Sequence, residues 1–355
     1  MTKGWDLLVR TDDIATTELR EAVVPAAADG EVVLALSRVG LTANNVTYAV
    51  LGGTLHYWRF FPTDDGWGRV PLWGFADVVA SRAEGVTEGE RYYGFLPTSC
   101  HLVVRPDRVG AHGFRDAAAH RRALPGVYNA YALTTGDASY DPAPEDLQVL
   151  FRPLFITSFA LAGHLADGGA RGAGTVVLSS ASSKTAYGTA ALLQGGAARV
   201  VGLTAAGNRE FVEALGCYDE VLTYDQVDRL PLEPTAYVDA AGDQRLRERL
   251  HEHLRDHLVL DLVLGVTHQD TGRAEVVHGA RPTQFFAPDV IRDRTAEWGR
   301  AGFEQRLGEA WAGFVPRAQL WVDVVPGHGP AELAHVWAEV VAGRAAPRTG
   351  HVLTF

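Results

Sequence analysis

The chain of 355 residues can form two domains of ordinary size or one large one, and its 47% hydrophobic content is enough for real cores. Its 32 basic and 43 acidic residues give a net charge of −11, and without a clustered basic patch this balance excludes nucleic-acid binding. Cys100 and Cys217, the only cysteines, lie in different halves of the chain, so we expect neither a disulfide scaffold nor a cysteine-rich zinc site.

The longest apolar runs are too short to cross a membrane. Residues 258–266, for example, are interrupted by Asp261 and fall short of the roughly 20 residues of a spanning helix. The amino terminus lacks the continuous apolar core of a secretion signal and soon reaches Asp12 and Asp13. We therefore expect a globular protein without a membrane segment, located in the cytoplasm.

Short β-rich runs, separated by Gly, Pro and Asp turns, occupy the first third of the chain. They are residues 31–41, 73–81 and 101–105. Because no helical pattern separates these runs, they predict a compact β-barrel-like domain that extends to about Leu124.

From about residue 150 the chain alternates between helix and strand patterns. We expect strands at residues 175–178, 199–203, 220–222, 236–239 and 258–266, and helices at residues 156–166, 208–215 and 244–257, with another helix directly after residue 178. This alternation is typical of βαβ units and predicts a parallel sheet with helices on both faces. A helix at residues 332–341 and a strand at residues 350–355 are then expected to rejoin the first domain.

The turn after the first of these strands is rich in serine, whereas a nucleotide-binding turn at this place is usually rich in glycine. The loop at the carboxyl end of a parallel strand faces the ligand crevice, and the following helix presents unpaired backbone amides there. Hydroxyls and an ammonium group can add to these amides in binding a phosphate. The candidates are Ser180, Ser182, Ser183, Lys184 and Thr185. The alternative is a turn in which a serine only caps the helix and the lysine is solvated.

The end of the next strand indicates which dinucleotide would bind. A carboxylate at this position binds the ribose hydroxyls of NAD, and its absence admits the 2′-phosphate of NADP. Here residues 202–209, at the end of the strand, contain no acidic residue before Glu210, which favours NADP(H). Thr204, Asn208 and Arg209 are the candidate phosphate contacts, although Arg209 is equally consistent with an exposed helix residue.

Several segments match, in order and spacing, the zinc-free quinone-reductase and enoyl-reductase branch of the medium-chain dehydrogenase/reductase superfamily. Residues 40–46, Gly-Leu-Thr-Ala-Asn-Asn-Val, resemble the family's Gly-Leu-Asn-x-x-Asp-Val, and residues 88–95 resemble its Val-Gly-Asp-Arg-Val-x-Gly. Residues 215–224 and 350–353 resemble Leu-Gly-Ala-Asp-x-Val-Ile-x-Tyr and the closing Gly-Lys-Val-Val strand. The chain departs from the family pattern at the glycine turn and at Asn45, where an aspartate is usual, so it resembles a divergent member.

The resemblance implies an α/β fold: a Rossmann-type doubly wound parallel sheet plus a β-rich GroES-like barrel domain. The corresponding domains are residues 1–124 (GroES-like), residues 125–314 (Rossmann-type) and residues 315–355 (return to the GroES-like domain). It also implies a possible homodimer and a metal-free, NADP(H)-dependent reduction of a small molecule, either a quinone or an activated C=C bond such as that of an enone or enoyl thioester. The alternatives are a non-catalytic dinucleotide-binding or regulatory protein and a non-redox isomerase or lyase.

Reduction of an activated alkene leaves an enolate that needs hydrogen-bond donors and then a proton. The candidate proton donors are Tyr48 and Tyr57, and Asn45 is a candidate for orienting the substrate oxygen. By analogy with the family, further cofactor contacts are expected at Tyr224, Gly265, Thr267 and Phe286. Ordinary core packing, turn formation and packing at strand ends are the alternatives for these residues.

Two other motifs are less informative. His253 and His257 have the helical spacing of metal ligands, but the order His-Glu-x-x-His and a third ligand are absent, so we expect a solvated helix face. The serine turn lacks the Gly-x-Ser-x-Gly pattern of a hydrolase nucleophile.

Overall fold

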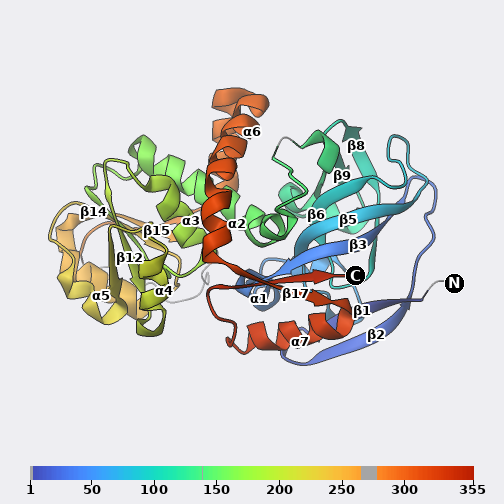
Figure 1. Cartoon of the computed structure of the whole chain (residues 1–355), viewed down its shortest axis with the longest axis horizontal. Helices are drawn as coiled ribbons and strands as arrows, with labels where there is room; N and C mark the ends of the chain where they lie inside the picture. Colours follow the sequence, from blue (N-terminus) through green and yellow to red (C-terminus); the bar gives the residue numbers. More distant parts are fainter. Residues whose placement is uncertain (1–2, 138, 265–277) are drawn as a thin grey trace. The chain divides into compact units, whose positions relative to one another are not determined.

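The computed structural model describes residues 3–137, 139–264 and 278–355, and it divides into two compact units (Figure 1). Unit 1 comprises Met1–Arg152 and Ala318–Phe355, and unit 2 comprises Pro153–Arg317. Residues 125–152 belong to unit 1, whereas we had assigned them to the second domain. They do so because a strand in this stretch, Ala130–Leu133, pairs with two strands of the unit 1 sheet.

Unit 1 is built from two sheets. The larger has the order β17-β18-β3-β5-β6-β10-β9-β8, with β7 also paired to β3, and the smaller has the order β2-β1-β4. Their strands are β1 (Lys3–Arg10), β2 (Thr17–Val23), β3 (Val32–Leu41), β4 (Trp67–Gly68), β5 (Leu72–Ser81), β6 (Arg91–Leu96), β7 (His101–Val104), β8 (Pro106–Gly110), β9 (Gly113–Asp116), β10 (Ala130–Leu133), β17 (Asp323–His328) and β18 (Thr349–Thr354). Since β18 pairs antiparallel with β3, residues from both ends of the sequence share one sheet.

Short helices complete unit 1. They are α1 (Ala43–Val50), α7 (Gly329–Val341) and the 3₁₀ helices η1 (Tyr57–Phe60), η2 (Ala119–Arg121), η3 (Gly126–Asn129) and η4 (Thr134–Gly136). Helix α7 buries Leu333, Val336, Trp337 and Val340 in the unit 1 core, the spacing of one apolar helix face. The Trp337 indole donates a hydrogen bond of 2.8 Å to the Ile14 carbonyl, so its polar group is also satisfied.

Helix α2 (Glu145–His164), followed by η5 (Leu165–Gly169), contains the boundary between the units, which falls at Pro153. Contrary to our expectation, the segment Glu145–Gly169 is long and apolar enough to cross a membrane by length and composition, and 50% of its apolar window is buried. Core helices of globular proteins pass the same test. The backbone of Val149 lies so close to β3 that a Cβ on Gly40 would stand 2.5 Å from the Val149 carbonyl oxygen, which explains the glycine there.

Unit 2 contains a six-stranded parallel sheet with the order β13-β12-β11-β14-β15-β16. Its strands are β11 (Thr175–Leu178), β12 (Arg199–Thr204), β13 (Glu220–Thr223), β14 (Thr235–Asp239), β15 (Leu258–Leu264) and β16 (Pro282–Phe285). All residues of β11 and β14 are buried, as is usual for a parallel sheet covered on both faces. The predicted doubly wound parallel sheet is therefore confirmed.

The helices of unit 2 follow the βαβ pattern. They are α3 (Lys184–Leu193), η6 (Ala206–Asn208), α4 (Arg209–Ala214), η7 (Tyr224–Arg229), α5 (Gln244–Leu254), η8 (Arg255–His257) and the long α6 (Ala287–Trp321). Helix α5 places Leu246, Leu250 and Leu254 in the same core cluster as Val177 and Tyr237 of the sheet. We had not predicted α6, which contains a non-helical Gly299 with φ of 71°.

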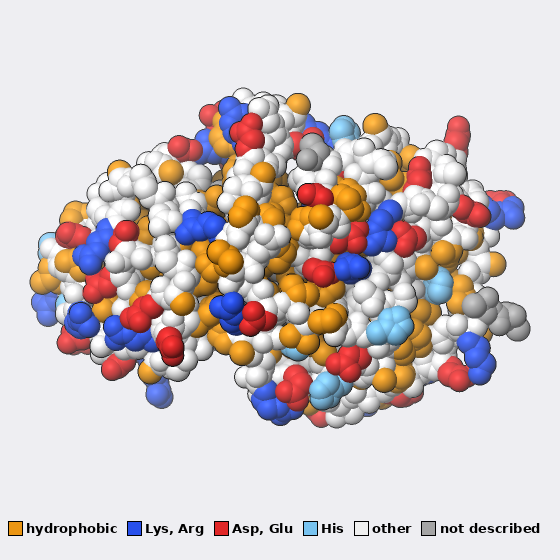
Figure 2. Space-filling view, in the orientation of Figure 1, with side chains coloured by type: hydrophobic (Ala, Val, Ile, Leu, Met, Phe, Trp, Pro, Cys, Tyr) orange, Lys and Arg blue, Asp and Glu red, His pale blue; other side chains and the backbone are white. Residues whose placement is uncertain are grey.

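The charged side chains of the described residues are mixed in sign on the face shown in Figure 2. Lys and Arg side chains lie among Asp and Glu side chains there, without a continuous basic area. On this face, the charge distribution is that of an ordinary solvated surface and not that of a phosphate-backbone binding site.

Candidate functional site

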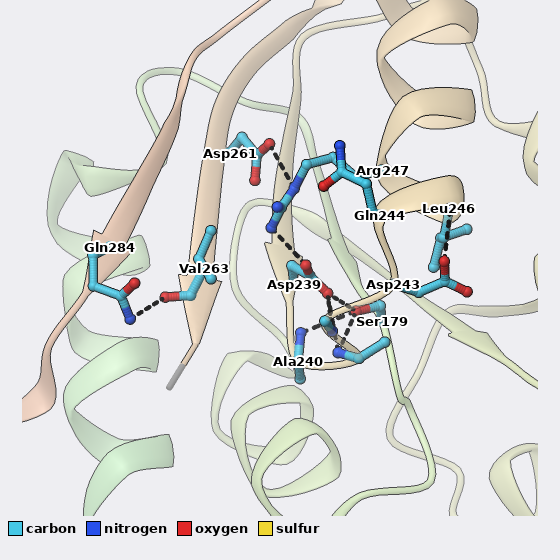
Figure 3. Close-up of polar contacts among 12 residues, drawn as sticks. Ser179, Asp239, Ala240, Asp243, Gln244, Leu246, Arg247, Asp261, Val263 and Gln284 are labelled. Atoms are coloured by element: carbon cyan, nitrogen blue, oxygen red, sulfur yellow. Dashed lines mark hydrogen bonds and ion pairs between the residues drawn. The ribbon is translucent and has the colours of Figure 1, made fainter. Parts of the chain in front are cut away.

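The site in unit 2 forms where the strand order reverses, at the carboxyl ends of β11 and β14. Strands β12 and β13 lie on one side of β11, and β14, β15 and β16 lie on the other. This is the place at which open parallel sheets bind ligands. The Ser179 hydroxyl, directly after β11, donates to Asp239 Oδ1 at 3.1 Å and accepts from the amides of Ala240 and Ala241 at 2.9 and 3.1 Å (Figure 3). Ser179 thus fastens the serine turn to the turn after β14.

Asp239 is the centre of this connection. Its fully buried carboxylate also accepts hydrogen bonds from the amides of Ala241 and Gly242 at 3.0 and 2.9 Å. Its second oxygen pairs with Arg247 Nη2 at 2.5 Å. Figure 3 shows how these contacts join the strand end to α5. A carboxylate with this many donors holds the turn in one conformation.

The serine turn itself is held by backbone and side-chain contacts. Ser180 has a φ of 49°, a conformation that favours glycine, and its amide donates to the Tyr224 hydroxyl at 3.2 Å. Ser183 is the N-cap of α3, since its hydroxyl accepts from the Ala186 amide at 3.3 Å. Neighbouring Thr185 lies in the first turn of α3. The turn therefore directs the amino end of a ten-residue helix toward the crevice.

The end of β12 lies against the serine turn. Asn208 Nδ2 donates to the Ser182 hydroxyl at 3.2 Å. Thr204 is fully buried, and its hydroxyl oxygen has no hydrogen-bond partner among the described residues. Arg209 is half-exposed and pairs with Glu213 at 2.7 Å, with a weaker contact to Gln226 at 3.4 Å. Of the three predicted phosphate contacts, Thr204 and Asn208 thus lie at the end of the strand beside the serine turn. Arg209 is a partly exposed helix residue in an ion pair.

Lys184 is the first residue of α3 and one of only two lysines in the chain, the other being Lys3. Burial lowers the pKa of Lys184 to about 8, although part of the side chain remains accessible. An anion beside the ammonium group would favour its charged form and offset the cost of burial.

Two of the remaining predicted cofactor contacts, Tyr224 and Phe286, directly follow strands of the same sheet. Tyr224 follows β13, and its backbone carbonyl accepts from Arg249 at 2.8 Å. Phe286 follows β16 and is 52% exposed. Gly265 and Thr267 lie outside the described residues.

In unit 1, Tyr48 lies in an aromatic cluster. Its hydroxyl accepts hydrogen bonds from Asn44 Nδ2 at 2.8 Å and from Trp73 Nε1 at 3.1 Å. Because both partners are donors, the hydroxyl proton itself remains available to a further acceptor. Burial raises the pKa of Tyr48 above its ordinary value, so the hydroxyl stays protonated at neutral pH.

The two other predicted catalytic residues have different surroundings. The Tyr57 ring centroid lies 4.7 Å from that of Tyr48, and the Tyr57 hydroxyl is 3.2 Å from the Tyr128 hydroxyl. The Asn45 amide is used within the fold: its Oδ1 accepts from the Thr42 amide at 2.8 Å, and its Nδ2 donates to the Pro71 carbonyl at 2.9 Å. Asn45 caps α1 and so holds the helix that carries Tyr48.

The histidine-rich helix contains a buried contact that the sequence did not reveal. His251 is buried, with Nε2 2.8 Å from Asp261 Oδ2 and Nδ1 2.7 Å from the His278 carbonyl. Both ring nitrogens of His251 therefore face hydrogen-bond acceptors, and Asp261 Oδ2 also lies 3.3 Å from Arg247 Nε. His253 Nε2 lies 2.8 Å from the Leu230 carbonyl. Within the described part of the chain, no three His, Cys, Asp or Glu side chains are grouped to hold a metal ion.

Comparison with known proteins places this geometry in context. A family model described as "Protein of unknown function (DUF2855)" matches residues 39–346, and no curated protein sequence matches the chain. The chain is similar to the structure of CurA from Vibrio vulnificus in complex with NADPH, with 11% identity and a TM-score of 0.65 over 99% of each chain. It is also similar to CurK enoyl reductase, with 12% identity and a TM-score of 0.59 over 99% of each chain.

A third similar structure is the quinone oxidoreductase from Coxiella burnetii, with 13% identity and a TM-score of 0.59 over 100% of each chain. At these identities the similarity establishes the fold. It is the fold of the medium-chain dehydrogenase/reductase superfamily, with Rossmann-type and GroES-like domains, so the resemblance inferred from the sequence is confirmed.

Proposed function

The chain belongs to the DUF2855 family, and we propose that it is an NADP(H)-dependent, metal-free reductase of a quinone or an activated carbon–carbon double bond. The observation that carries the proposal is the serine turn at the reversal point of the parallel sheet, with a buried ammonium and a helix amino end beside it. The NADPH complex of CurA, on the same fold, supports the same cofactor.

The residues present fit a dinucleotide. The pyrophosphate would be held by the serine turn and the first turn of α3, through Ser180, Ser182, Ser183, Lys184 and Thr185. The unsatisfied Thr204 hydroxyl would gain an acceptor, and Asn208 and Arg209 would lie beside the 2′-phosphate. Tyr224 would contact the adenosine end, and Phe286, with Gly265 and Thr267, the nicotinamide end. No carboxylate precedes Glu210 to repel the 2′-phosphate, which favours NADPH over NADH.

Bound NADPH supplies a hydride to a conjugated alkene, which leaves an enolate. Tyr48 is suited to deliver the proton that the enolate needs. Asn44 and Trp73 both donate hydrogen bonds to its hydroxyl oxygen, so they orient the hydroxyl and leave its proton free to be donated. Tyr57 is the second candidate for this role, and Asn45 is a positioning residue that holds α1 in place.

Titration with NADPH and NADH, followed by calorimetry, tests the cofactor assignment. We expect tighter binding of NADPH, and we expect Lys184→Ala to weaken it roughly 10-fold or more, since an exposed ion pair would contribute only about 0.2–1 kcal/mol. Lys3→Ala is the matched control, because Lys3 is an exposed surface residue paired with Glu21. Equal binding by wild type and Lys184→Ala would contradict the proposed pyrophosphate site.

NADPH oxidation in the presence of a panel of enones, enoyl thioesters and quinones tests the reaction. Turnover with at least one class is expected. NADPH binding without any turnover would instead favour a non-catalytic dinucleotide-binding protein, and activity without added cofactor would favour an isomerase or lyase.

We also propose, from the resemblance alone, a homodimer in the cytoplasm with a small-molecule substrate. Sedimentation equilibrium of the purified protein tests the dimer. A monomer at micromolar concentration would refute it.

A further inference from the structure

Four aromatic side chains line one face of the strand pair β5 and β6, and we call them the aromatic face: Trp73, Phe75, Tyr93 and Phe95. They share this face because Trp73 pairs with Phe95 and Phe75 with Tyr93 in the antiparallel register. Trp73 stacks on Tyr93 with ring centroids 5.7 Å apart, and the Arg152 guanidinium carbon lies 4.4 Å from the Tyr93 ring centroid.

Two hydrogen-bond donors beside this face have no acceptor within the described part of the chain. The Tyr93 hydroxyl belongs to a side chain only 5% exposed, and neither it nor the buried Arg152 Nη1 has a hydrogen-bond partner among the described residues. Buried donors are nearly always satisfied, so two of them on stacked groups are open to an acceptor that none of the described residues supplies.

The charge at this position restricts what the acceptor can be. Arg152 Nη2 pairs with Asp137 Oδ2 at 2.5 Å, and the other Asp137 oxygen accepts from the amide and hydroxyl of Ser139 at 2.9 and 2.6 Å. Burial acts to raise the pKa of Asp137, but Arg152 and Ser139 bring it below its ordinary value, so the carboxylate stays ionised. Asp137 therefore neutralises Arg152, so an acceptor that reached these two donors would meet an ion pair without net charge.

We propose that the Tyr93 hydroxyl and Arg152 Nη1 together bind the carbonyl oxygen of the substrate. This inference rests on the proposed reductase function and names its substrate class: conjugated aldehydes, ketones, thioesters or quinones, and not free carboxylates. A neutral carbonyl oxygen can accept hydrogen bonds from both donors without electrostatic repulsion. A carboxylate at the same place would be repelled by the nearby Asp137 carboxylate.

The chemistry balances with NADPH as the reductant. Hydride adds to the β-carbon, the alkene electron pair moves to form the enolate oxygen, and the two donors stabilise the negative charge on that oxygen. Tyr48 then protonates the α-carbon, the carbonyl re-forms, and water restores the Tyr48 proton. Trp73 links the two functions, since it donates to the Tyr48 hydroxyl and stacks on Tyr93.

A spectroscopic probe tests the carbonyl site without any turnover. The absorption of 4-(dimethylamino)cinnamaldehyde moves to longer wavelength when its carbonyl oxygen accepts hydrogen bonds. We expect this shift on binding to the wild-type protein without cofactor, and its loss, with binding at least 10-fold weaker, in Tyr93→Phe and Arg152→Lys. Arg152→Lys keeps the charge beside Asp137 and removes the planar donor pair, so it separates hydrogen bonding from folding.

Tyr92→Phe is the matched control, because Tyr92 precedes Tyr93 on the opposite face of β6 and donates to Glu90 at 2.7 Å. It should retain the full shift. An unshifted probe in the wild type, or an undiminished shift in both Tyr93→Phe and Arg152→Lys, overturns the carbonyl site. A shift that these variants abolish upholds the site even if no NADPH is oxidised, which would refute only the reductase function.

A comparison of cinnamaldehyde with cinnamate tests the substrate class. We expect binding of the aldehyde to be at least 10-fold tighter in the wild type. Asp137→Asn should narrow this difference by improving cinnamate binding, because the positive charge of Arg152 is then no longer neutralised by a carboxylate. A wild-type preference for cinnamate overturns the inference.

Discussion

Replacement of Lys184 by methionine should stabilise the cofactor-free protein, although it removes a proposed binding residue. A fall of the pKa from the ordinary 10.5 to about 8 corresponds to about 3 kcal/mol, because a tenfold change in proton affinity is worth about 1.4 kcal/mol. This is the free energy by which burial disfavours the charged lysine in the folded state at neutral pH. Since part of the side chain remains accessible and methionine would lose the interaction that Lys184 makes in the folded protein, we expect Lys184→Met to raise the free energy of unfolding by about 1–2 kcal/mol at pH 7.

The direction of the pH dependence follows from the same shift. Below pH 8 the lysine is charged in both the folded and the unfolded chain, so the burial of the charge destabilises the folded state. Between pH 8 and 10.5 it is neutral when folded and charged when unfolded, so wild-type stability rises relative to Lys184→Met. The difference between the two proteins should therefore shrink as the pH rises through this interval and vanish above it.

Urea unfolding followed by tryptophan fluorescence, at several pH values from 7 to 10.5, measures this difference. Lys3→Met, at an exposed position, should change the unfolding free energy by less than about 0.5 kcal/mol at every pH. A Lys184→Met variant no more stable than the wild type at pH 7, or a difference that grows with pH, would refute the reasoning. Saturating NADPH should reverse the order of stability, because only the wild type would gain the ammonium–phosphate contact.

Three further outcomes are expected. His251→Leu should lower the unfolding free energy by about 1–3 kcal/mol in thermal unfolding, because the fully buried Asp261 loses its histidine partner and keeps only Arg247, whereas the exposed His257→Ala should change it little. Tyr48→Phe should lower kcat by about 10²-fold or more without changing the NADPH Kd, and unchanged steady-state turnover would exclude Tyr48 as the proton donor. Amine-selective labelling at pH 8, mapped by mass spectrometry, should modify Lys184, and NADPH should protect it; labelling unaffected by saturating NADPH would contradict contact with the cofactor.

Most of the parallel sheet was predictable because its first five strands leave a local signal, whereas the sixth, β16, was not predicted. Residues 175–178 of β11 are buried on both faces, so the strand appears as a continuous run of β-branched and apolar residues between glycines and serines. Helix α6 was not predicted, because Gly299 interrupts it and its apolar residues do not form one clear face. Strands β1 and β2 were also missed, since their pairing with each other is evident only in the structure.

The candidate site was predictable only where residues are neighbours in the chain. The serine turn follows a strand directly, so its position at the crevice could be inferred. The partners of Asp239, Asp261 and Tyr93 come from other elements, and no local pattern indicates them. Asp261 gave one signal, a charge within an apolar strand, and such a residue needs a buried partner that the sequence does not identify.

The pairing of β18 with β3 determines the order in which the two units can be completed during translation. All of unit 2 is synthesised before β17 and β18, which supply one edge of the larger unit 1 sheet. Until those strands leave the ribosome, β3 lacks one of its neighbours and exposes unpaired backbone groups. Unit 2 is therefore the first that can fold to completion, and a ribosome that stalls before residue 349 leaves a nascent chain with an open, aggregation-prone sheet edge.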